Sequence, residues 1–342
     1  MSGTRKWPRA VASGVALAKM SVLPVAFFAF FVTPRIGTSG ATTAELSRVW
    51  PGDDLVPHPA FVWTNAVTVA RPAAEVWPWV TQLGQGRGGL YSYDWLENAV
   101  LADVHSVSEL VPALQRPLEV GDRVVRMTRY APANPVAGYD AGRALVLGGV
   151  TDSPSQLGAG QPSSTWAFIV DPVATDRCRL IVRSRASGLA ARLQGPIQFV
   201  MQRRMMLGIK QRAEGTWSRS VADVLIPLSW FTAAAAAAVH GCRAVLRGRG
   251  RSRDLVMGSL AGIGVQVLLF WDVPAVLRAA LVAALAGSAP LHLEGDPTGR
   301  ASAASPPCAA TLRRATACWP VSSHVIRNRY RRLRWSSATG WS

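Results

Sequence analysis

The sequence of 342 residues predicts an α+β domain that lies between apolar segments long enough to cross a membrane. Three observations predict this class. Side chains alternate between two faces over residues 61–69, as in a strand. Several further strand candidates follow two short helices. Over residues 195–217, apolar side chains recur at helical spacing. A run of strands that ends in one long helix is typical of an α+β fold.

The strand candidates each place apolar side chains on one face. After residues 61–69, further strands are predicted at 123–129, 143–150, 164–170 and 178–185. We expect the shared faces to point at a common interior. They carry Phe61, Trp63, Val67 and Val69, then Trp166, Phe168 and Val170, then Cys178, Leu180 and Val182.

Proline and glycine set the bounds of the two short helices. Pro72 suits the first position of a helix over 72–83, Pro78 is expected to kink it, and Gly84 ends it. The second short helix is predicted over 91–98.

The long helix is predicted to open at Gly195-Pro196 and to run to Trp217. Met201 and Met205 lie on its apolar face and are expected either to contact a ligand or to form core, because methionine adapts to irregular apolar shapes. The apolar face consists of Ile197, Met201, Met205, Gly208, Ile209 and Ala213, opposite Gln198, Arg203, Gln211 and Arg212.

A stretch rich in aromatic residues and glycine joins the two short helices. Glycine lets the backbone turn tightly, and Trp and Tyr present an apolar body with a polar tip, so this stretch predicts the mouth of an apolar pocket. For any single tryptophan, the alternative is plain core. The stretch contains Trp77, Trp79, Tyr91, Tyr93 and Trp95, with Gly84, Gly86, Arg87, Gly88 and Gly89 in the loop.

Gly84, Gly86 and Gly89 spell G-x-G-x-x-G. As a dinucleotide signature, this motif needs a strand before it and a helix that opens after it. A helix precedes it here, so a dinucleotide site is excluded. We expect no cofactor.

Charge and cysteine content exclude two further classes. The net charge of +17 lies mainly in the ends, since residues 42–219 carry 18 basic and 15 acidic side chains. Basic residues beside apolar runs are typical of membrane segments, and we expect no nucleic acid partner. The four cysteines form no C-x-x-C pair, which indicates neither a disulfide framework nor a metal site.

Apolar runs predict membrane helices on both sides of the domain. Residues 11–32 suit one crossing, with a cleaved signal peptide as the alternative, and residues 221–239, 255–271 and 273–291 predict two or three more. The arginines between residues 243 and 253 indicate a cytoplasmic loop. An integral protein of a bacterial-type cell membrane is therefore expected, with its domain on the extracytoplasmic side if residues 11–32 span.

The resulting division is a basic segment with a transmembrane or signal-anchor helix at 1–39, a domain at 40–219, transmembrane helices at 220–293 and a disordered basic tail at 294–342. Gly258 and Gly262 form G-x-x-x-G, which can support helix–helix association.

Several stretches together resemble the SRPBCC superfamily, the START and Bet v 1-like helix-grip proteins often described as polyketide cyclase/dehydrase or lipid transport. They read GATTAELSRVWPGDDLV, EVWPWVTQLGQGRGGLYSYDWLEN, VGDRV, RLIVRSR and FVMQRRMMLGIKQRAE. The resemblance covers residues 40–217. It implies a curved antiparallel sheet that grips the long helix, with a hydrophobic cavity between them.

The sequence contains no H-E-x-x-H, G-x-S-x-G or Walker motif. Asp94 and Glu97 lie three apart on one face of the second short helix and are weak candidates for a general acid or base. The alternative is that Asp94 caps a helix or pairs with Arg87, while Glu97 is solvated. Arg183 and Arg185 are expected to face solvent or to bind an acidic neighbour.

The expected function is binding of a lipophilic small molecule, lipid or polyketide-like, by a membrane-anchored domain without catalysis. A cyclase or aromatase-like enzyme and a non-catalytic membrane scaffold remain alternatives, and membrane lipid is a further expected partner. The candidate ligand-binding residues are Trp77, Tyr91, Tyr93, Trp95, Trp166, Phe168, Met201 and Met205.

Overall fold

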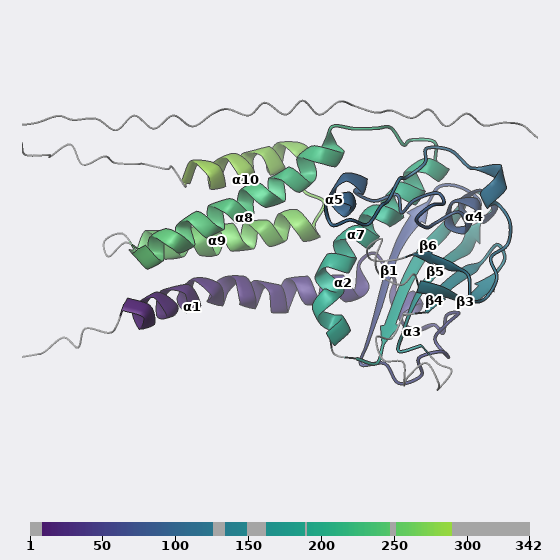
Figure 1. Cartoon of the computed structure of the whole chain (residues 1–342), viewed down its shortest axis with the longest axis horizontal. Coiled ribbons are helices and arrows are strands. Elements are labelled where there is room, and N and C mark those ends of the chain that lie inside the picture. Colours follow the sequence, from purple (N-terminus) through teal and green to yellow (C-terminus); the bar gives the residue numbers. More distant parts are fainter. Residues whose placement is uncertain (1–8, 126–133, 149–161, 189, 247–250, 289–342) are drawn as a thin grey trace, which may run out of the picture. The chain divides into compact units, whose positions relative to one another are not determined.

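The structure is a computed structural model that describes residues 9–125, 134–148, 162–188, 190–246 and 251–288. These residues form an antiparallel sheet with helices packed on it, together with a group of long apolar helices (Figure 1). The α+β prediction is therefore confirmed. The predicted tail at 294–342 lies outside the described residues.

The sheet has six antiparallel strands in the order β1-β6-β5-β4-β3-β2. β3 was not predicted, because its Asn134-Pro135 start and Gly138 resemble a turn. A shift of register between Val136 and Gly138 keeps β3 paired with β4. The strands are β1 Phe61–Val69, β2 Arg123–Val125, β3 Asn134–Asp140, β4 Ala144–Gly148, β5 Ser164–Ala174 and β6 Arg177–Ala186.

Helices cover one face of the sheet, and a short N-terminal segment covers the other. The inner face packs against α4 (Ala73–Thr81) and α7 (Ala190–Ala213), and α5 (Asp94–Ala99) follows the glycine-rich loop. On the outer face, Trp50 packs on the sheet just after α3 (Thr43–Ser47). The inner face carries Val67, Val69, Leu145, Leu147, Phe168, Val170, Leu180 and Val182, and the outer face carries Ala66, Ala144, Val146, Ala167, Ile169 and Ile181.

Helix α7 begins earlier and ends earlier than predicted. It includes Gly195 and Pro196 within its length, so the predicted start at these residues was wrong. The glycine serves close packing instead, since a Cβ there would lie 1.9 Å from the Trp63 ring on β1. The helix ends at Ala213 rather than at Trp217, because Gly215 adopts a φ of 69° just beyond it.

Three helices are long and apolar enough to cross a membrane: Val11–Thr38, Ala222–Leu246 and Ser252–Phe270. The structure is thus compatible with the membrane association that the sequence predicts. The first comprises α1 (Arg9–Phe27), a π-helical turn η1 (Phe28–Val32) and α2 (Thr33–Thr38). The others are α8 (Ala222–Leu246) and α9 (Arg251–Phe270), and the shorter α10 (Ala275–Ser288) follows.

Small residues on α9 allow α1 to approach closely. The backbone of α1 accepts hydrogen bonds from Ser259 at Met20 (2.7 Å) and from Gln266 at Pro24 (3.0 Å). Gly258 and Gly262 lie opposite the same two residues of α1. The G-x-x-x-G pair therefore faces a helix of its own chain.

We predict that Gly208→Ala destabilises the fold. A Cβ at this position of α7 would lie 2.2 Å from the backbone oxygen of Tyr91, so the helix would have to shift. The free energy of unfolding should fall by about 1–3 kcal/mol, although alanine normally favours a helix by about 0.5–1 kcal/mol. Chemical denaturation of the full chain in detergent, followed by tryptophan fluorescence, measures this. Gly188→Ala is the control, because a Cβ there meets nothing within 4 Å; equal stability of the two variants would contradict the prediction.

Candidate functional site

Aromatic side chains line the interior between the sheet and α7. Trp166 and Phe168 on β5 lie with ring centroids 4.7 Å apart, and Trp77 on α4 lies 5.5 Å from Tyr139 on β3. Met205 of α7 is buried in the same cluster. Five predicted ligand-binding residues are thus brought together here: Trp77, Tyr91, Trp166, Phe168 and Met205.

A short chain of polar side chains crosses this interior. Trp166 donates from Nε1 to Gln202 Oε1 at 2.9 Å, and Gln202 donates from Nε2 to Asn65 Oδ1 at 2.7 Å. Asn65 in turn donates to the backbone oxygen of Ile36, at the end of the first apolar helix. The sequence prediction overlooked Asn65 and Gln202. Asn65 could have been found, because it occupies an inward position of β1 between Trp63 and Val67.

The other predicted ligand-binding residues lie beside the long apolar helix α8 or the residues at its start. Tyr93 packs edge-on against Trp230 of α8, with ring centroids 5.4 Å apart. Met201 of α7 packs against the same cluster. Trp95 is partly exposed and donates from Nε1 to the Asp223 carbonyl at 3.0 Å. The predicted set therefore divides between the interior cluster and a second cluster formed with the long apolar helices.

The glycine-rich loop has a structural role in this arrangement. Gly84 and Gly89 pair as an isolated antiparallel bridge, and both have positive φ, as Gly86 does. Gly88 lies so close to Gln82 and Tyr91 that a Cβ would come within 2.7 Å of each.

Arg87 of this loop caps helix α4. It donates to the Thr81 carbonyl at 2.9 Å and to the Leu83 carbonyl at 3.2 Å. Such contacts satisfy the unpaired carbonyls at the helix end. The expected pairing of Arg87 with Asp94 is not formed.

Asp94 instead accepts two hydrogen bonds from Ser106, at 2.6 Å from its backbone N–H and 2.7 Å from its hydroxyl. The same hydroxyl accepts from the backbone N–H of Tyr91 at 2.8 Å.

Tyr91 has a φ of 56°, an uncommon backbone conformation for a bulky residue, and the Arg212 guanidinium lies 4.6 Å from its ring centroid. Burial raises the pKa of the Tyr91 hydroxyl, so the side chain stays protonated.

Glu97 is buried, so the expectation that it is solvated was wrong. Its side chain lies on α5 with a residue exposure of 8%, and its Oε2 has no hydrogen-bond partner among the described residues. Burial raises its pKa to about 7, and the nearby charge of Asp94 adds to this. A carboxyl with this pKa can hold or release a proton near neutral pH.

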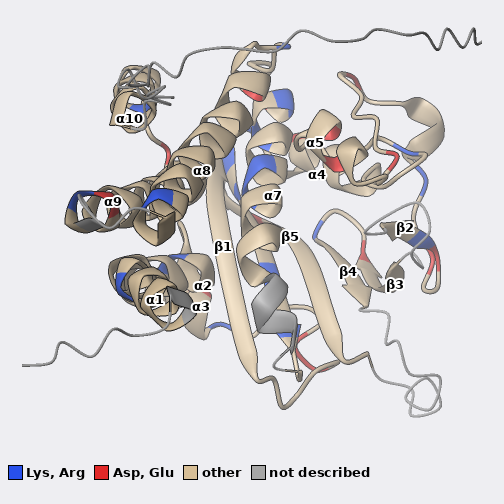
Figure 2. Ribbon diagram, turned by 60° about the vertical axis from the view of Figure 1, so that its left-hand side comes forward, with Lys and Arg blue, Asp and Glu red and all other residues tan. Residues whose placement is uncertain are grey.

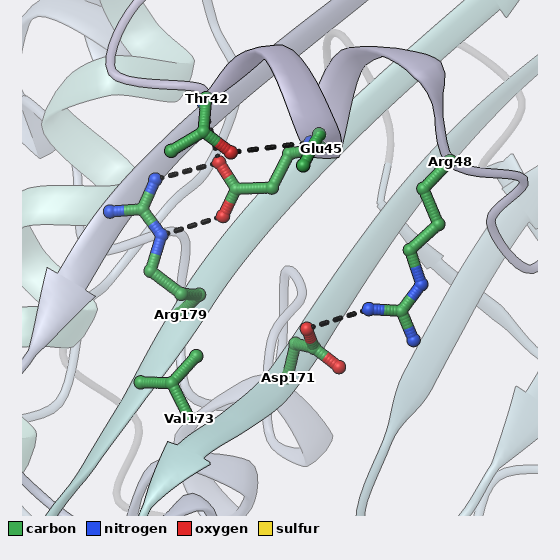
Figure 3. A pocket seen from close by; sticks show the side chains of 7 residues that line it. Thr42, Glu45, Arg48, Asp171, Val173 and Arg179 are labelled. Atoms are coloured by element: carbon green, nitrogen blue, oxygen red, sulfur yellow. Dashed lines mark hydrogen bonds and ion pairs between the residues drawn. The ribbon is translucent and has the colours of Figure 1, made fainter.

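Two pockets lie on the outer face of the sheet, and paired charges border the first of them. One, of about 360 Å³, is lined by Glu45, Arg48, Asp171 and Arg179 (Figure 3). Glu45 pairs with Arg179 at 2.7 Å, and Arg48 pairs with Asp171 at 2.9 Å. A second pocket of about 320 Å³ lies beside Val146. Because the charges of the first pocket are used internally, we assign it a structural role.

Arg183 and Arg185 contact the same outer-face segment. Arg183 pairs with Asp53 at 2.7 Å, and Arg185 approaches the same carboxylate at 3.3 Å. Of the two expectations for these arginines, an acidic neighbour is correct.

The described residues contain no group of three or more His, Cys, Asp or Glu side chains that could hold a metal ion. The interior beneath α7 consists of closely packed apolar side chains and a few polar groups that are hydrogen-bonded to one another. Apolar walls with a few polar groups are the usual composition of a site for an apolar ligand.

No family model matches the chain, and no curated protein matches it. Three solved structures are similar over 45–46% of it. MLL2253 from Mesorhizobium loti has 14% identity over 99% of its own chain and a TM-score of 0.27. EF2215 from Enterococcus faecalis, a conserved protein of unknown function, has 12% identity over 74% and a TM-score of 0.26. The Polyketide_cyc-like protein Cgl2372 from Corynebacterium glutamicum has 15% identity over 88% and a TM-score of 0.21. Scores this low carry no functional argument.

We predict that Glu97 makes stability depend on pH. Its pKa is raised from 4.5 unfolded to about 7 folded, so between these values the folded chain keeps a proton that the unfolded chain has released. The free energy of unfolding should therefore fall as pH rises from 4.5 to 7, by up to about 3 kcal/mol, and then level off.

Glu97→Gln should remove this dependence. The variant should match the unmodified chain at pH 4.5 and exceed it in stability at pH 8, as denaturation at a series of pH values would show. Glu119→Gln, at an exposed position, should leave the profile unchanged. A profile that Glu97→Gln does not flatten would count against the buried carboxyl as its cause.

Proposed function

We propose that this chain is an integral membrane protein whose domain at 40–219 binds a lipophilic small molecule between α7 and the sheet. One observation carries the proposal: α7 is apolar on two sides. Its Met205, Met206 and Ile209 pack into the aromatic interior, while Val200 and Met201 pack with Tyr93 and the long apolar helices.

This placement gives an apolar ligand a short route. A lipophilic molecule that partitions into the bilayer lies on one side of α7, and an apolar interior lies on the other. Displacement of side chains beside Met205 would admit it, because methionine readily changes shape. The chain Trp166–Gln202–Asn65 supplies donors and acceptors for a polar end of the ligand.

We further propose that the domain lies on the extracytoplasmic side. Met20 of α1 contacts both Gly241 of α8 and Gly258 of α9, and further along Phe28 packs against Phe270. The start of α1, the end of α8 and the start of α9 therefore lie together. This end carries Arg243, Arg251 and Arg253, and the domain joins the other end.

The first prediction from this proposal is a co-purifying apolar molecule. Native mass spectrometry of the full chain in mild detergent should detect it. Met205→Trp, which fills the interior, should reduce the bound amount tenfold or more, equivalent to at least about 1.4 kcal/mol of binding free energy. Met201→Trp is the matched control, because Met201 lies one helical turn earlier and packs with Tyr93 and Trp230 instead of the interior cluster, and it should retain the ligand.

Melting temperatures of both variants establish that each is folded. A chain that is empty under all conditions, or a ligand that survives Met205→Trp in the folded variant, would refute the interior site. An empty and fully packed interior would favour the scaffold function instead.

The second prediction concerns the side of the membrane. In a chain whose native cysteines are replaced by serine, Thr175→Cys on the exposed β5–β6 turn should react with an impermeant maleimide in intact cells. Ser252→Cys at the basic end should react after permeabilisation, because it faces the cytoplasm. The reverse pattern would place the domain inside.

A second candidate function rests on Glu97. A buried carboxyl with a pKa near 7 could transfer a proton in a cyclase or aromatase-like reaction on a polyketide-type substrate. Asp94 is the weaker candidate of the two, because Ser106 occupies both of its oxygens. Loss of turnover with retained ligand binding in Glu97→Gln would favour this enzyme over a binding protein.

A further inference from the structure

A group of charged side chains lies where α7 and α5 meet the ends of the membrane helices. We name it the junction cluster. Its members are Arg35 of α2, Arg203 and Arg204 of α7, Asp223 of α8, Asp272 after α9, and Arg278 of α10. Figure 2 marks the basic positions along α7 in blue.

Two of the four arginines have carboxylate partners. Arg204 pairs with Asp223 at 2.6 Å, and Arg203 pairs with Asp272, which is largely exposed. These pairs neutralise half of the positive charge of the cluster.

The other two arginines contact neutral acceptors. Arg35 donates from Nε to the Phe270 carbonyl, and Arg278 donates to the Ser229 hydroxyl at 3.0 Å and to the Leu268 carbonyl at 3.4 Å. Within the described residues neither forms an ion pair. Four guanidinium groups against two carboxylates leave a formal surplus of two positive charges.

The surplus positive charge affects the pKa of Arg203. Burial lowers its pKa to about 10, and the neighbouring charge of Arg35 lowers it further in the same direction. An anion bound between Arg35 and Arg203 would offset this repulsion. Each guanidinium retains N–H groups suited to a phosphate, which guanidinium binds with two parallel hydrogen bonds.

The surroundings of the cluster resemble a membrane interface. The Arg35 guanidinium lies 5.0 Å from the ring centroid of Trp271, and Tyr93 packs against Trp230 nearby. Trp and Tyr gather at the level of lipid headgroups. One helical turn before Arg35, Phe31 is 58% exposed, and Phe30 beside it is 76% exposed. Arg35 and Phe31 share one side of the helix.

We propose that the junction cluster binds the phosphate of an anionic phospholipid, held mainly by Arg35 and Arg203, with the acyl chains along Phe30 and Phe31. The exposed phenylalanines favour a lipid over free phosphate, because inorganic phosphate would leave them uncovered. The site is separate from the interior beneath α7 and does not depend on a ligand there.

The test uses the full chain in nanodiscs of equimolar phosphatidylglycerol and phosphatidylcholine, followed by native mass spectrometry after release. The unmodified chain should retain more phosphatidylglycerol than phosphatidylcholine. Arg35→Gln and Arg203→Gln should each weaken this retention about fivefold. Asp272→Asn should strengthen it, since Asp272 competes with the phosphate for Arg203.

Arg48→Gln is the matched control, because Arg48 pairs with Asp171 on the outer face of the sheet. Melting temperatures in detergent show whether each variant folds, and the opposite effect of Asp272→Asn separates loss of binding from loss of structure. Equal retention of the two lipids by the unmodified chain would overturn the proposal. Weaker retention of phosphatidylglycerol by Asp272→Asn than by the unmodified chain would also overturn it. If excess inorganic phosphate abolishes lipid retention and itself raises the melting temperature, the site binds free anions, and the lipid assignment fails.

Discussion

Helix α7 packs on two sides at once, and the rest of the chain provides a partner for each side. On one side, Gly195 and Gly208 let the helix approach Trp63 and the Tyr91 backbone within distances that any side chain would prevent. On the other side, Val200 packs with the long apolar helices. Polar side chains that the structure describes on α7 find partners, such as Asn65 for Gln202 and Asp223 for Arg204. A helix with two buried sides links the packing of the interior to the packing of the long apolar helices.

The parts of the fold that follow local rules could be predicted from the sequence. Alternation located β1, β5 and β6, and Pro72, Pro78 and Gly84 located α4 closely. The errors occurred where tertiary packing decides. Gly195-Pro196 has the appearance of a helix start, yet its glycine serves the contact with Trp63. β3 was missed because a bulge, rather than regular alternation, fits it into the sheet.

The candidate site was predictable in composition more than in geometry. Aromatic residues and methionine indicated an apolar interior, and five of the eight chosen side chains meet there. Tyr93 and Met201 pack with the long apolar helices instead, and periodicity alone could not reveal this second apolar partner of α7. Partners distant in sequence were equally hidden: Arg183 pairs with an aspartate 130 positions earlier, and Glu97 gave no sign that it would be buried.

The hydrogen bond from Asn65 to the Ile36 carbonyl bears on the biogenesis of this protein. Ile36 lies at the end of the first apolar helix and packs beside Phe199 of α7. A leader peptidase that cut beyond Ile36 would remove this acceptor and leave a buried amide unsatisfied, at a cost of about 1–3 kcal/mol. It would also uncover the apolar surface of Phe199. The N-terminal helix thus supplies both a hydrogen-bond acceptor for Asn65 and apolar cover for Phe199 in the folded chain.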